Sequence, residues 1–470
     1  MIGQLSSLGE LVSDQAMPPF VYCYPPRSAY VAAEKPFSLP RLWDADLRHS
    51  GYDLNLYIHI PFCGYRCGFC NLYTLSGVAT DDMSSYVDGI CSQLLMSSEI
   101  IQSRNLRTIY IGGGTPTVLP PADIRKIFKT LSRIYPAWPS VVEEVAIEAS
   151  PDSLAKDSGA LAAALRDMGI TRINLGVQSL DHNELIEAGR RRANGKAVHE
   201  ACAAVRRAQI PNLSTDLIIG FASQTDRSWE SSVEQLLALG PDTISTYFLT
   251  VRPDARFGRS ERYGYARSPN PYLRYEVGRQ RILAAGFVQE TNVRYKIPGV
   301  GGYRQKALQF RGIPVLGVGA GARSYTNTND YIIGGHHRPN VSQIRSYLQS
   351  IAEGSTPISA GFAFDDEERV RKRLALDLFD LRLDEIGNSE PIITNCGLQG
   401  VLDEGVLLGL LKKMGPRAYQ ITSEGFKYRD ILSWAFFSPK VRQRNENFYA
   451  SIEHDERRPI RLRRGTLASV

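Results

Sequence analysis

Residues 56–70 read Leu-Tyr-Ile-His-Ile-Pro-Phe-Cys-Gly-Tyr-Arg-Cys-Gly-Phe-Cys, which is an apolar, strand-like stretch followed by three closely spaced cysteines. The cysteines are Cys63, Cys67 and Cys70, and their spacing, C-x3-C-x2-C, places them on one tight loop. Three thiolates can hold three irons of a [4Fe–4S] cluster and leave the fourth iron without a protein ligand. The stretch therefore predicts a strand that ends in a loop built to bind a cluster.

An iron without a protein ligand predicts a chelating cofactor. The α-amino and α-carboxylate groups of S-adenosylmethionine (SAM) could bind it, and an electron from the cluster would then break a carbon–sulfur bond and leave a 5′-deoxyadenosyl radical. The alternative is a structural zinc site with His59 as the fourth ligand. Zinc sites often use paired C-x2-C units, but the remaining cysteines are isolated: Cys23, Cys91, Cys202 and Cys396. The spacing favours the cluster and leaves zinc open.

Around this loop, strand-like and helix-like stretches alternate. The expected strands are Leu54–Ile60, Arg107–Ile111, Val142–Glu148, Thr171–Val177, Asn212–Ile219 and Thr243–Thr250. The expected helices between them are Asp82–Gln102, Pro121–Ile134, Leu154–Met168, Lys196–Ala208 and Ser228–Leu239. Such β-then-α units predict parallel strands joined by right-handed crossovers. We therefore expect an α/β fold with a partial or full (β/α) TIM-type barrel, whose functional residues gather where strands end.

Four regions are expected along the 470 residues. Residues 1–50 form an N-terminal arm, in which prolines break any helix and aromatic residues suggest packing on a folded body. Residues 51–359 form the barrel. A small C-terminal domain with a helix–helix–wing pattern covers residues 360–445, and a basic tail covers residues 446–470. The pattern consists of helical Glu367–Leu381 and Gln399–Lys413 and a strand at Ala418–Thr422.

Composition excludes several classes of partner. The formal charge of +6 is small for this length, and Lys and Arg do not cluster along the barrel, so we expect no nucleic acid. No run of about 18 apolar residues occurs, so we expect no membrane span. The segment Met1–Ser13 lacks the features of a secretory signal, and clustered thiols suit a reducing compartment. These observations predict a cytoplasmic protein.

Polar residues stand at the ends of several expected strands. Glycines at a strand end allow a ligand to approach the backbone, so the second strand's end is a candidate site for the SAM amino group. Arg190 could pair with the SAM carboxylate. Polar groups inside a barrel need partners, and a ligand with ribose hydroxyls would supply them. The candidates are Gly112–Gly114, Glu148, Gln178, Arg190 and Asp216.

At this point the sequence resembles the radical SAM superfamily, and within it the oxygen-independent coproporphyrinogen III oxidase (HemN)-like family. The matching barrel segments are 57–63, 112–117, 147–151, 174–178 and 216–220. The segments 419–425 and 434–438 resemble that family's winged-helix-like accessory domain. The resemblance covers about residues 50–440.

The resemblance implies two sets of SAM-binding residues. The first set would contact the cluster-bound SAM and comprises Tyr57, Phe69, Gly113, Glu148, Gln178, Arg190 and Asp216. Several family members bind a second SAM, and the matching positions are Gly114, Thr115, Thr250 and Arg323. The cofactors implied are one [4Fe–4S] cluster and one or two SAM molecules. The implied partners are a small-molecule substrate and an external electron donor such as flavodoxin or ferredoxin.

Departures from the family pattern bear on the reaction. The porphyrinogen decarboxylases carry a further Cys just after the third ligand, whereas here Cys70 is followed by Asn71. Arg311 stands where those enzymes have a glutamine, and the 302–308 segment differs from that of the haem-chaperone branch. We expect radical C-methylation or cyclopropanation of a small molecule with a second SAM. Porphyrinogen decarboxylation and haem delivery stay open as alternatives, and the substrate is not predicted.

Overall fold

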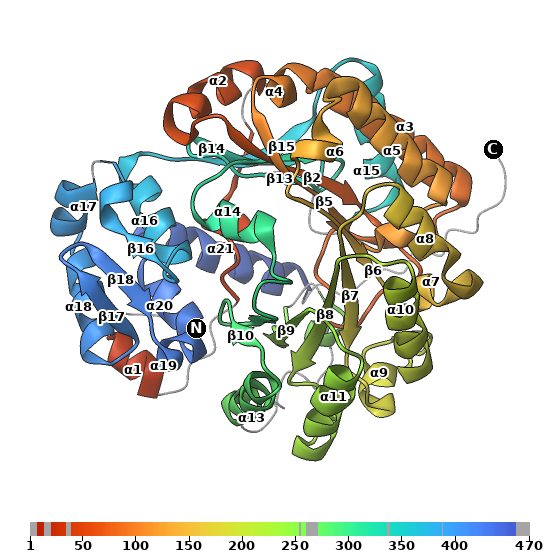
Figure 1. Ribbon diagram of the computed structural model, residues 1–470. Helices are drawn as coiled ribbons and strands as arrows, with labels where there is room; N and C mark the ends of the chain where they lie inside the picture. The colour runs from red at the N-terminus through yellow and green to blue at the C-terminus, as the bar shows by residue number, and fades with distance from the viewer. Residues whose placement is uncertain are drawn as a thin grey trace.

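The computed structural model describes residues 7–13, 20–33, 39–252, 255–259, 271–335, 339–387 and 389–456. Figure 1 shows a curved central sheet with helices on its outer side and a separate helical body built from the C-terminal residues. The first described residues lie against that body, not against the sheet (Figure 1).

The central sheet holds nine strands, in the order β10-β11-β9-β8-β7-β6-β5-β2-β12. The seven parallel strands are β12 (Val315–Val318), β2 (Asp53–Ile60), β5 (Asn105–Gly113), β6 (Glu144–Ala149), β7 (Arg172–Gln178), β8 (Asn212–Ile219) and β9 (Thr243–Phe248). The antiparallel strands β11 (Arg294–Lys296) and β10 (Val288–Gln289) extend one edge. In the described residues β12 and β10 do not pair with each other, so the sheet is a partial barrel. The predicted α/β fold is confirmed.

The crossover helices cover the outer face of this sheet. They are α3 (Thr80–Met96), α4 (Ser98–Gln102), α5 (Pro121–Ile134), α8 (Ala160–Asp167), α10 (Gly195–Arg207) and α11 (Asp226–Ala238). In α5 the buried Ile124, Ile127 and Leu131 recur at helical spacing, which gives the helix one apolar face. The predicted helix at 82–102 is divided at Ser97, whose backbone leaves the helical region between α3 and α4.

The N-terminal arm is more regular than expected. It contains the helices α1 (Leu8–Ser13) and α2 (Leu39–Ser50) and the short strand β1 (Val31–Ala32). The expectation that prolines break any helix there was wrong for α2, because Pro40 falls in its first turn, where no intrahelical N–H is needed. Strand β1 joins an antiparallel sheet, β1-β15-β14-β13, through β15 (Ile358–Ala363). The other two strands are β14 (Asn329–Ile333) and β13 (Arg323–Ser324).

The C-terminal body has its own hydrophobic core and a three-stranded sheet, β16-β18-β17. Its elements are α16 (Asp366–Leu376), β16 (Leu381–Arg382), α17 (Ser389–Asn395), α18 (Leu398–Leu407), β17 (Leu411–Gly415), β18 (Ala418–Ile421), α19 (Ser423–Lys427), α20 (Arg429–Ala435) and α21 (Pro439–Glu456). The predicted helix Gln399–Lys413 was too long: α18 ends before Gly409, whose φ of +71° is left-handed, and 411–413 pair with β18.

Four arm residues, Leu8, Val21, Tyr24 and Ala29, belong to the core of the C-terminal body. The backbone N–H of Val21 donates to Asp430 at 3.1 Å, and the Tyr24 ring packs edge-on against Phe437. The predicted tail at 446–470 begins inside α21, and its residues from 457 lie outside the described part. No described helix is both long enough and apolar enough to cross a membrane.

Candidate functional site

The three clustered cysteines lie on the loop that follows β2. Cys63 ends the short strand β3 (Phe62–Cys63), which pairs with β4 (Leu75–Ser76). All three thiols are free and half-buried. Two of the sulfurs accept hydrogen bonds. The Thr115 hydroxyl donates to Cys63 Sγ at 3.6 Å, and Arg190 Nη1 donates to Cys67 Sγ at 3.2 Å. The loop is thus placed at the carboxyl edge of the parallel sheet, where barrel enzymes carry their chemistry.

The donor set fits a [4Fe–4S] cluster. In the described residues no three His, Cys, Asp or Glu side chains converge as ligands of a single metal ion. A cubane has a different requirement, since each thiolate binds its own iron and the sulfurs need not meet at one point. Burial raises the pKa of the Cys63 thiol to about 12 and also raises the pKa of Cys70. Cluster binding would have to displace these protons.

His59 has a structural role that competes with metal binding. Its Nδ1 lies 2.8 Å from the Tyr57 hydroxyl, and its Nε2 lies 2.9 Å from the carbonyl oxygen of Tyr73. A carbonyl can only accept, so Nε2 carries the proton and Nδ1 accepts from Tyr57. Burial lowers the pKa of His59 to about 4, which keeps the ring neutral. Both nitrogens are used, so His59 does not fit the role of a fourth zinc ligand.

Two glycines let the cysteine loop pack closely on its surroundings. A Cβ at Gly68 would lie 2.1 Å from the Phe257 ring, and a Cβ at Gly114 would lie 2.4 Å from the Phe62 carbonyl oxygen and 3.0 Å from Cys63 Sγ. The backbone of Gly68 also forms two hydrogen bonds, from its N–H to Ala188 O and from Phe257 N–H to its carbonyl, both 2.9 Å. The loop is therefore held from both sides.

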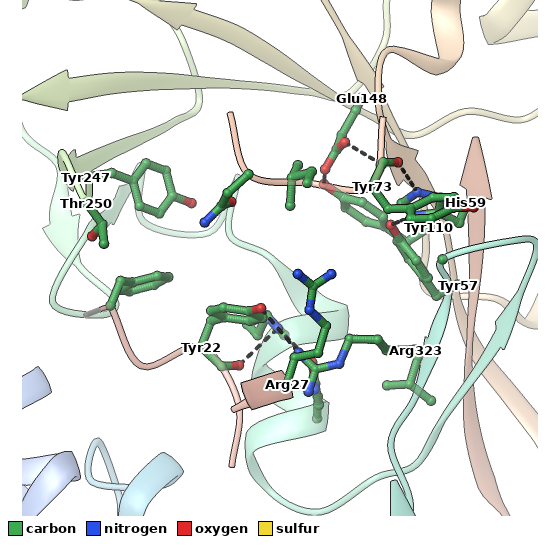
Figure 2. A pocket seen from close by; sticks show the side chains of 18 of the residues that line it. Tyr22, Arg27, Tyr57, His59, Tyr73, Tyr110, Glu148, Tyr247, Thr250 and Arg323 are labelled. Atoms are coloured by element: carbon green, nitrogen blue, oxygen red, sulfur yellow. Dashed lines mark hydrogen bonds between the residues drawn. The ribbon is translucent and has the colours of Figure 1, made fainter. Parts of the chain in front are cut away.

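A cavity of about 410 Å³ opens beside this loop. Its walls come from the sheet, from the arm and from the segment after β9, as Figure 2 shows. Of the residues predicted to bind SAM, six line the cavity: Tyr57, Phe69, Gly113, Glu148, Thr250 and Arg323. The others, which are not part of its lining, are Gly114, Thr115, Gln178, Arg190 and Asp216. These six residues come from six separate segments of the chain, which the fold brings to one cavity.

Glu148 occupies the sheet side of the cavity. Its Oε1 accepts a hydrogen bond from the Tyr110 hydroxyl at 2.7 Å, and its Oε2 accepts one from the Gly113 N–H at 2.9 Å. Asn174 Nδ2 donates in turn to the Tyr110 hydroxyl at 2.8 Å. Burial raises the pKa of Glu148. These contacts fix the carboxylate at the cavity wall, where it can accept a hydrogen bond from a ligand hydroxyl or amino group.

Gln178 ends β7, and Arg190 contacts the cysteine loop. Arg190 is 6% exposed and bonds Cys67 Sγ and the Gly176 carbonyl, but its buried Nε has no partner among the described residues. An unpartnered guanidinium N–H is costly to bury. A carboxylate ligand would satisfy it, so the residue fits the SAM carboxylate role. Gln178 has a φ of +72°, rare for a residue with a Cβ, at the bulge that ends β7.

Asp216 lies within β8, and the charges of Arg172 and Arg294 favour its ionised form. Burial raises its pKa from 3.8 to about 6, although both arginines oppose the shift. A carboxylate whose pKa is raised by folding is stabilised in its protonated form. Its contribution to stability is therefore fully present below about pH 4 and is lost as the pH rises through about 6.

We expect the Asp216→Asn variant to gain stability relative to the parent as the pH rises. Asn cannot ionise, so the difference in free energy of unfolding between the two proteins should change by up to about 3 kcal/mol from pH 4 to pH 8. Urea unfolding of metal-free protein at pH 4, 6 and 8 would measure it. The exposed Asp403→Asn is the control. A pH-independent difference for Asp216→Asn would contradict a raised pKa.

The residues assigned to a second SAM are not brought together in one place. Arg323 lies at the arm, where its guanidinium donates to the Tyr30 hydroxyl at 2.7 Å and to the Tyr22 hydroxyl at 3.2 Å. Cys23 Sγ accepts from the same group at 3.4 Å. Gly114 and Thr115 instead pack at Cys63. Figure 2 shows Thr250 on the opposite side of the cavity from Tyr57 and His59, while Arg323 lies with Tyr22 and Arg27.

Several cavity residues were missed by sequence reasoning. Arm residues contribute to the wall, and so do residues from β5, from β9 and the segment after it, and from the helix α14 (Arg304–Phe310) and the residue before it. They are Phe20, Tyr22, Arg27, Tyr110, Tyr247, Arg252, Tyr303, Lys306 and Gln309. The aromatic spacing of the arm indicated packing on the body but not its location. Tyr110 could have been found from the alternation of β5, since it shares the inward side with Gly112.

Comparisons with known proteins bear on the superfamily and on the fold of this chain. The sequence pattern of the Radical SAM superfamily matches residues 57–236. Among solved structures, coproporphyrinogen III oxidase (HemN) from Escherichia coli superposes with a TM-score of 0.74 over 91% of this chain and 98% of that chain, at 19% identity. This likeness supports the fold alone.

Three curated relatives carry one of two names, heme chaperone HemW or oxygen-independent coproporphyrinogen III oxidase. The chain is 32% identical over 281 residues to heme chaperone HemW of Synechocystis sp., covering 57% of this chain and 65% of that protein. It is 28% identical to HemW of Bacillus subtilis, covering 68% of this chain and 82% of that protein. It is 27% identical to the oxygen-independent coproporphyrinogen III oxidase of Pseudomonas aeruginosa, covering 73% of this chain and 75% of that protein. The first of these three is matched over slightly less than two thirds of its length.

Proposed function

We propose that this chain cleaves SAM reductively at a [4Fe–4S] cluster and modifies a small molecule, because residues 57–236 match the Radical SAM superfamily and the fold resembles that of HemN. The observation that carries the proposal is the set of three free cysteines on one loop, beside a cavity whose wall includes Gly113 and Glu148. When bound, the cluster would supply the electron that SAM cleavage requires.

The protein's own residues bind, orient and shield. Cys63, Cys67 and Cys70 would hold the cluster, with Arg190 donating to the Cys67 sulfur. The unpartnered Arg190 Nε suits the carboxylate of SAM, and Glu148 suits an amino or hydroxyl group. Phe69 packs edge-on against Phe221 and Phe257, which excludes water from one side of the loop.

The cavity lining supports an acidic, unsaturated substrate. Four basic side chains contribute to the lining, which contains one carboxylate, Glu148; they are Arg27, Arg252, Lys306 and Arg323. Burial lowers the pKa of Lys306 to about 8, and its ammonium donates to Gln309 Oε1 at 2.8 Å. Aromatic rings from the arm and from the sheet face the same space, including Tyr22, Tyr110 and Tyr247. A planar molecule with a carboxylate would satisfy both kinds of group.

In the finer proposal, a second SAM provides a carbon that is joined to an sp2 carbon of this substrate, giving C-methylation or cyclopropanation. Asn71 in place of the extra decarboxylase cysteine supports this choice. Thr250 in the cavity wall can contact a second cofactor. Arg323 would have to exchange its arm contacts to do so, because its guanidinium already donates to the Tyr22 and Tyr30 hydroxyls.

Isotope labelling tests both the reductive cleavage of SAM and the transfer of a carbon from a second SAM. Anaerobically reconstituted protein, given dithionite, methyl-labelled SAM and a panel of unsaturated carboxylic acids, should form 5′-deoxyadenosine and transfer label to one acid, as read by mass spectrometry. Deoxyadenosine without label transfer would contradict the second-SAM reaction but keep SAM cleavage. A preparation that binds zinc instead of iron and sulfide, and forms no deoxyadenosine, would overturn the whole proposal.

Haem binding is the second candidate function, because the first two relatives above are named heme chaperones. It predicts a stoichiometric Soret band on titration with haemin and no product. Porphyrinogen decarboxylation, the activity named for the third relative, predicts carbon dioxide release from coproporphyrinogen. The same preparation can be divided among the three assays.

A further inference from the structure

Four exposed arginines lie on the cysteine loop and on two chain segments that are hydrogen-bonded to it, and we propose that they dock an acidic electron-carrier protein. The group comprises Arg66, Arg191, Arg192 and Arg256, all exposed, and is called here the arginine rim. The inference rests on the proposed function, since a docked carrier would deliver the electron that the cluster needs. One electron would leave the carrier's reduced flavin or iron–sulfur centre and enter the cluster; docking itself makes and breaks no bond.

Three chain segments carry the rim arginines. One is the cysteine loop, and hydrogen bonds to the backbone of Gly68 connect the other two segments to it. Arg66 belongs to the cysteine loop itself. Arg191 and Arg192 directly follow Arg190, which donates to Cys67 Sγ, and the carbonyl of nearby Ala188 accepts from Gly68 N–H. Arg256 precedes Phe257, whose N–H donates to the Gly68 carbonyl. Three chain segments thus place their basic side chains around one loop.

The four rim arginines differ in their contacts, since Arg256 Nη2 donates to the carbonyl oxygen of Glu187 at 3.2 Å. In the described part of the chain, no ion pair is formed by Arg66, Arg191 or Arg192. Glu187 accepts from the backbone N–H groups of Ala222 and Ser223, at 3.2 and 3.0 Å, and Asp152 accepts from the Tyr65 hydroxyl at 3.2 Å. The charges of Arg66, Arg191 and Arg192 are therefore available to a partner.

Position and charge together indicate what kind of partner fits. Electron transfer slows steeply with distance, so a donor must approach close to the cysteine loop. The exposed Ile186 of α9 (His182–Glu187) lies in the chain segment just before Ala188, and an apolar residue within a charged rim is typical of protein interfaces. Redox encounters use small interfaces whose complementary charges mainly raise the association rate. A negatively charged one-electron carrier matches these properties.

The double variant Arg191→Glu/Arg192→Glu tests the rim with two separate readouts. Binding of an acidic flavodoxin to the holoprotein, measured by fluorescence anisotropy at low ionic strength, should weaken by roughly tenfold or more. The parent's affinity should fall with added salt, because exposed charges are screened. Deoxyadenosine formation driven by dithionite, a small reductant, should be unchanged, whereas flavodoxin-driven formation should fall.

Lys412→Glu/Lys413→Glu is the matched control, since it makes the same charge change on exposed β17 in the C-terminal body, well away from α9 in Figure 1. It should bind flavodoxin like the parent. Equal binding by the Arg191/Arg192 variant and the parent, equal loss in both variants, or no binding by the parent would overturn the docking surface. Binding lost in the rim variant while no protein forms deoxyadenosine would keep the surface and reject the proposed function.

Discussion

The Cys67→Ala protein should lack the broad visible absorption of an iron–sulfur cluster and should lose 5′-deoxyadenosine formation by at least about 100-fold. Removing a group that merely orients a metal ligand costs about 10–100-fold, and here a ligand itself is removed. Cys67 has a second function in the loop, because its sulfur accepts the hydrogen bond from Arg190 Nη1. The substitution therefore removes one iron ligand and frees a buried cation. Iron and sulfide analysis and anaerobic absorption spectra would measure the loss.

Cys396→Ala is the matched control for this variant. Cys396 is also a free, half-buried thiol, but it follows α17 in the C-terminal body. It should load a full cluster and form deoxyadenosine at the parental rate. A Cys67→Ala protein with normal iron content and activity would show that the cluster, if present, uses other ligands.

The Gly114→Ala protein should lose cluster loading and lower deoxyadenosine formation by roughly 100-fold. The added Cβ would lie 2.4 Å from the Phe62 carbonyl oxygen, so strand β5's end or the cysteine loop must move. It would also lie 3.0 Å from Cys63 Sγ, so the movement reaches a cluster ligand. A misplacement of about 1 Å at a reacting group can cost about 10²-fold in rate. Iron content and turnover would be measured on the same sample.

Gly64→Ala provides a control in the same loop. Gly64 follows Cys63 directly, yet nothing lies within 4 Å of the position its Cβ would take, and its φ is not in the left-handed region. It should behave like the parent. Equal cluster loading in Gly114→Ala and Gly64→Ala would show that the contact at Cys63 does not control the site.

The periodicity of apolar residues predicted the positions of several strands and helices. The alternation of apolar strands with amphipathic helices placed β2, β5, β7 and β8 within a few residues, because each element's periodicity is written in its own sequence. Errors occurred at ends, as at α18, where Gly409 stops the helix and pairing with β18 turns the next residues into a strand. Strand pairing joins residues that are distant in the sequence, so no local signal reveals it.

The sequence by itself determined the chemistry of the loop: three cysteines at a fixed spacing, followed by a glycine-rich strand end, are sufficient to predict cluster ligands and a ligand site. Only the tertiary structure decided which residues enclose that site. Tyr22 of the arm contacts Arg323, although the two residues are about 300 positions apart in the sequence. The aromatic rings of the arm also form part of the cavity wall. The arm also engages Arg323, whereas the fold of the barrel and the cysteine loop sets His59 between Tyr57 and Tyr73. Burial and long-range packing, which depend on the whole chain, assign these roles.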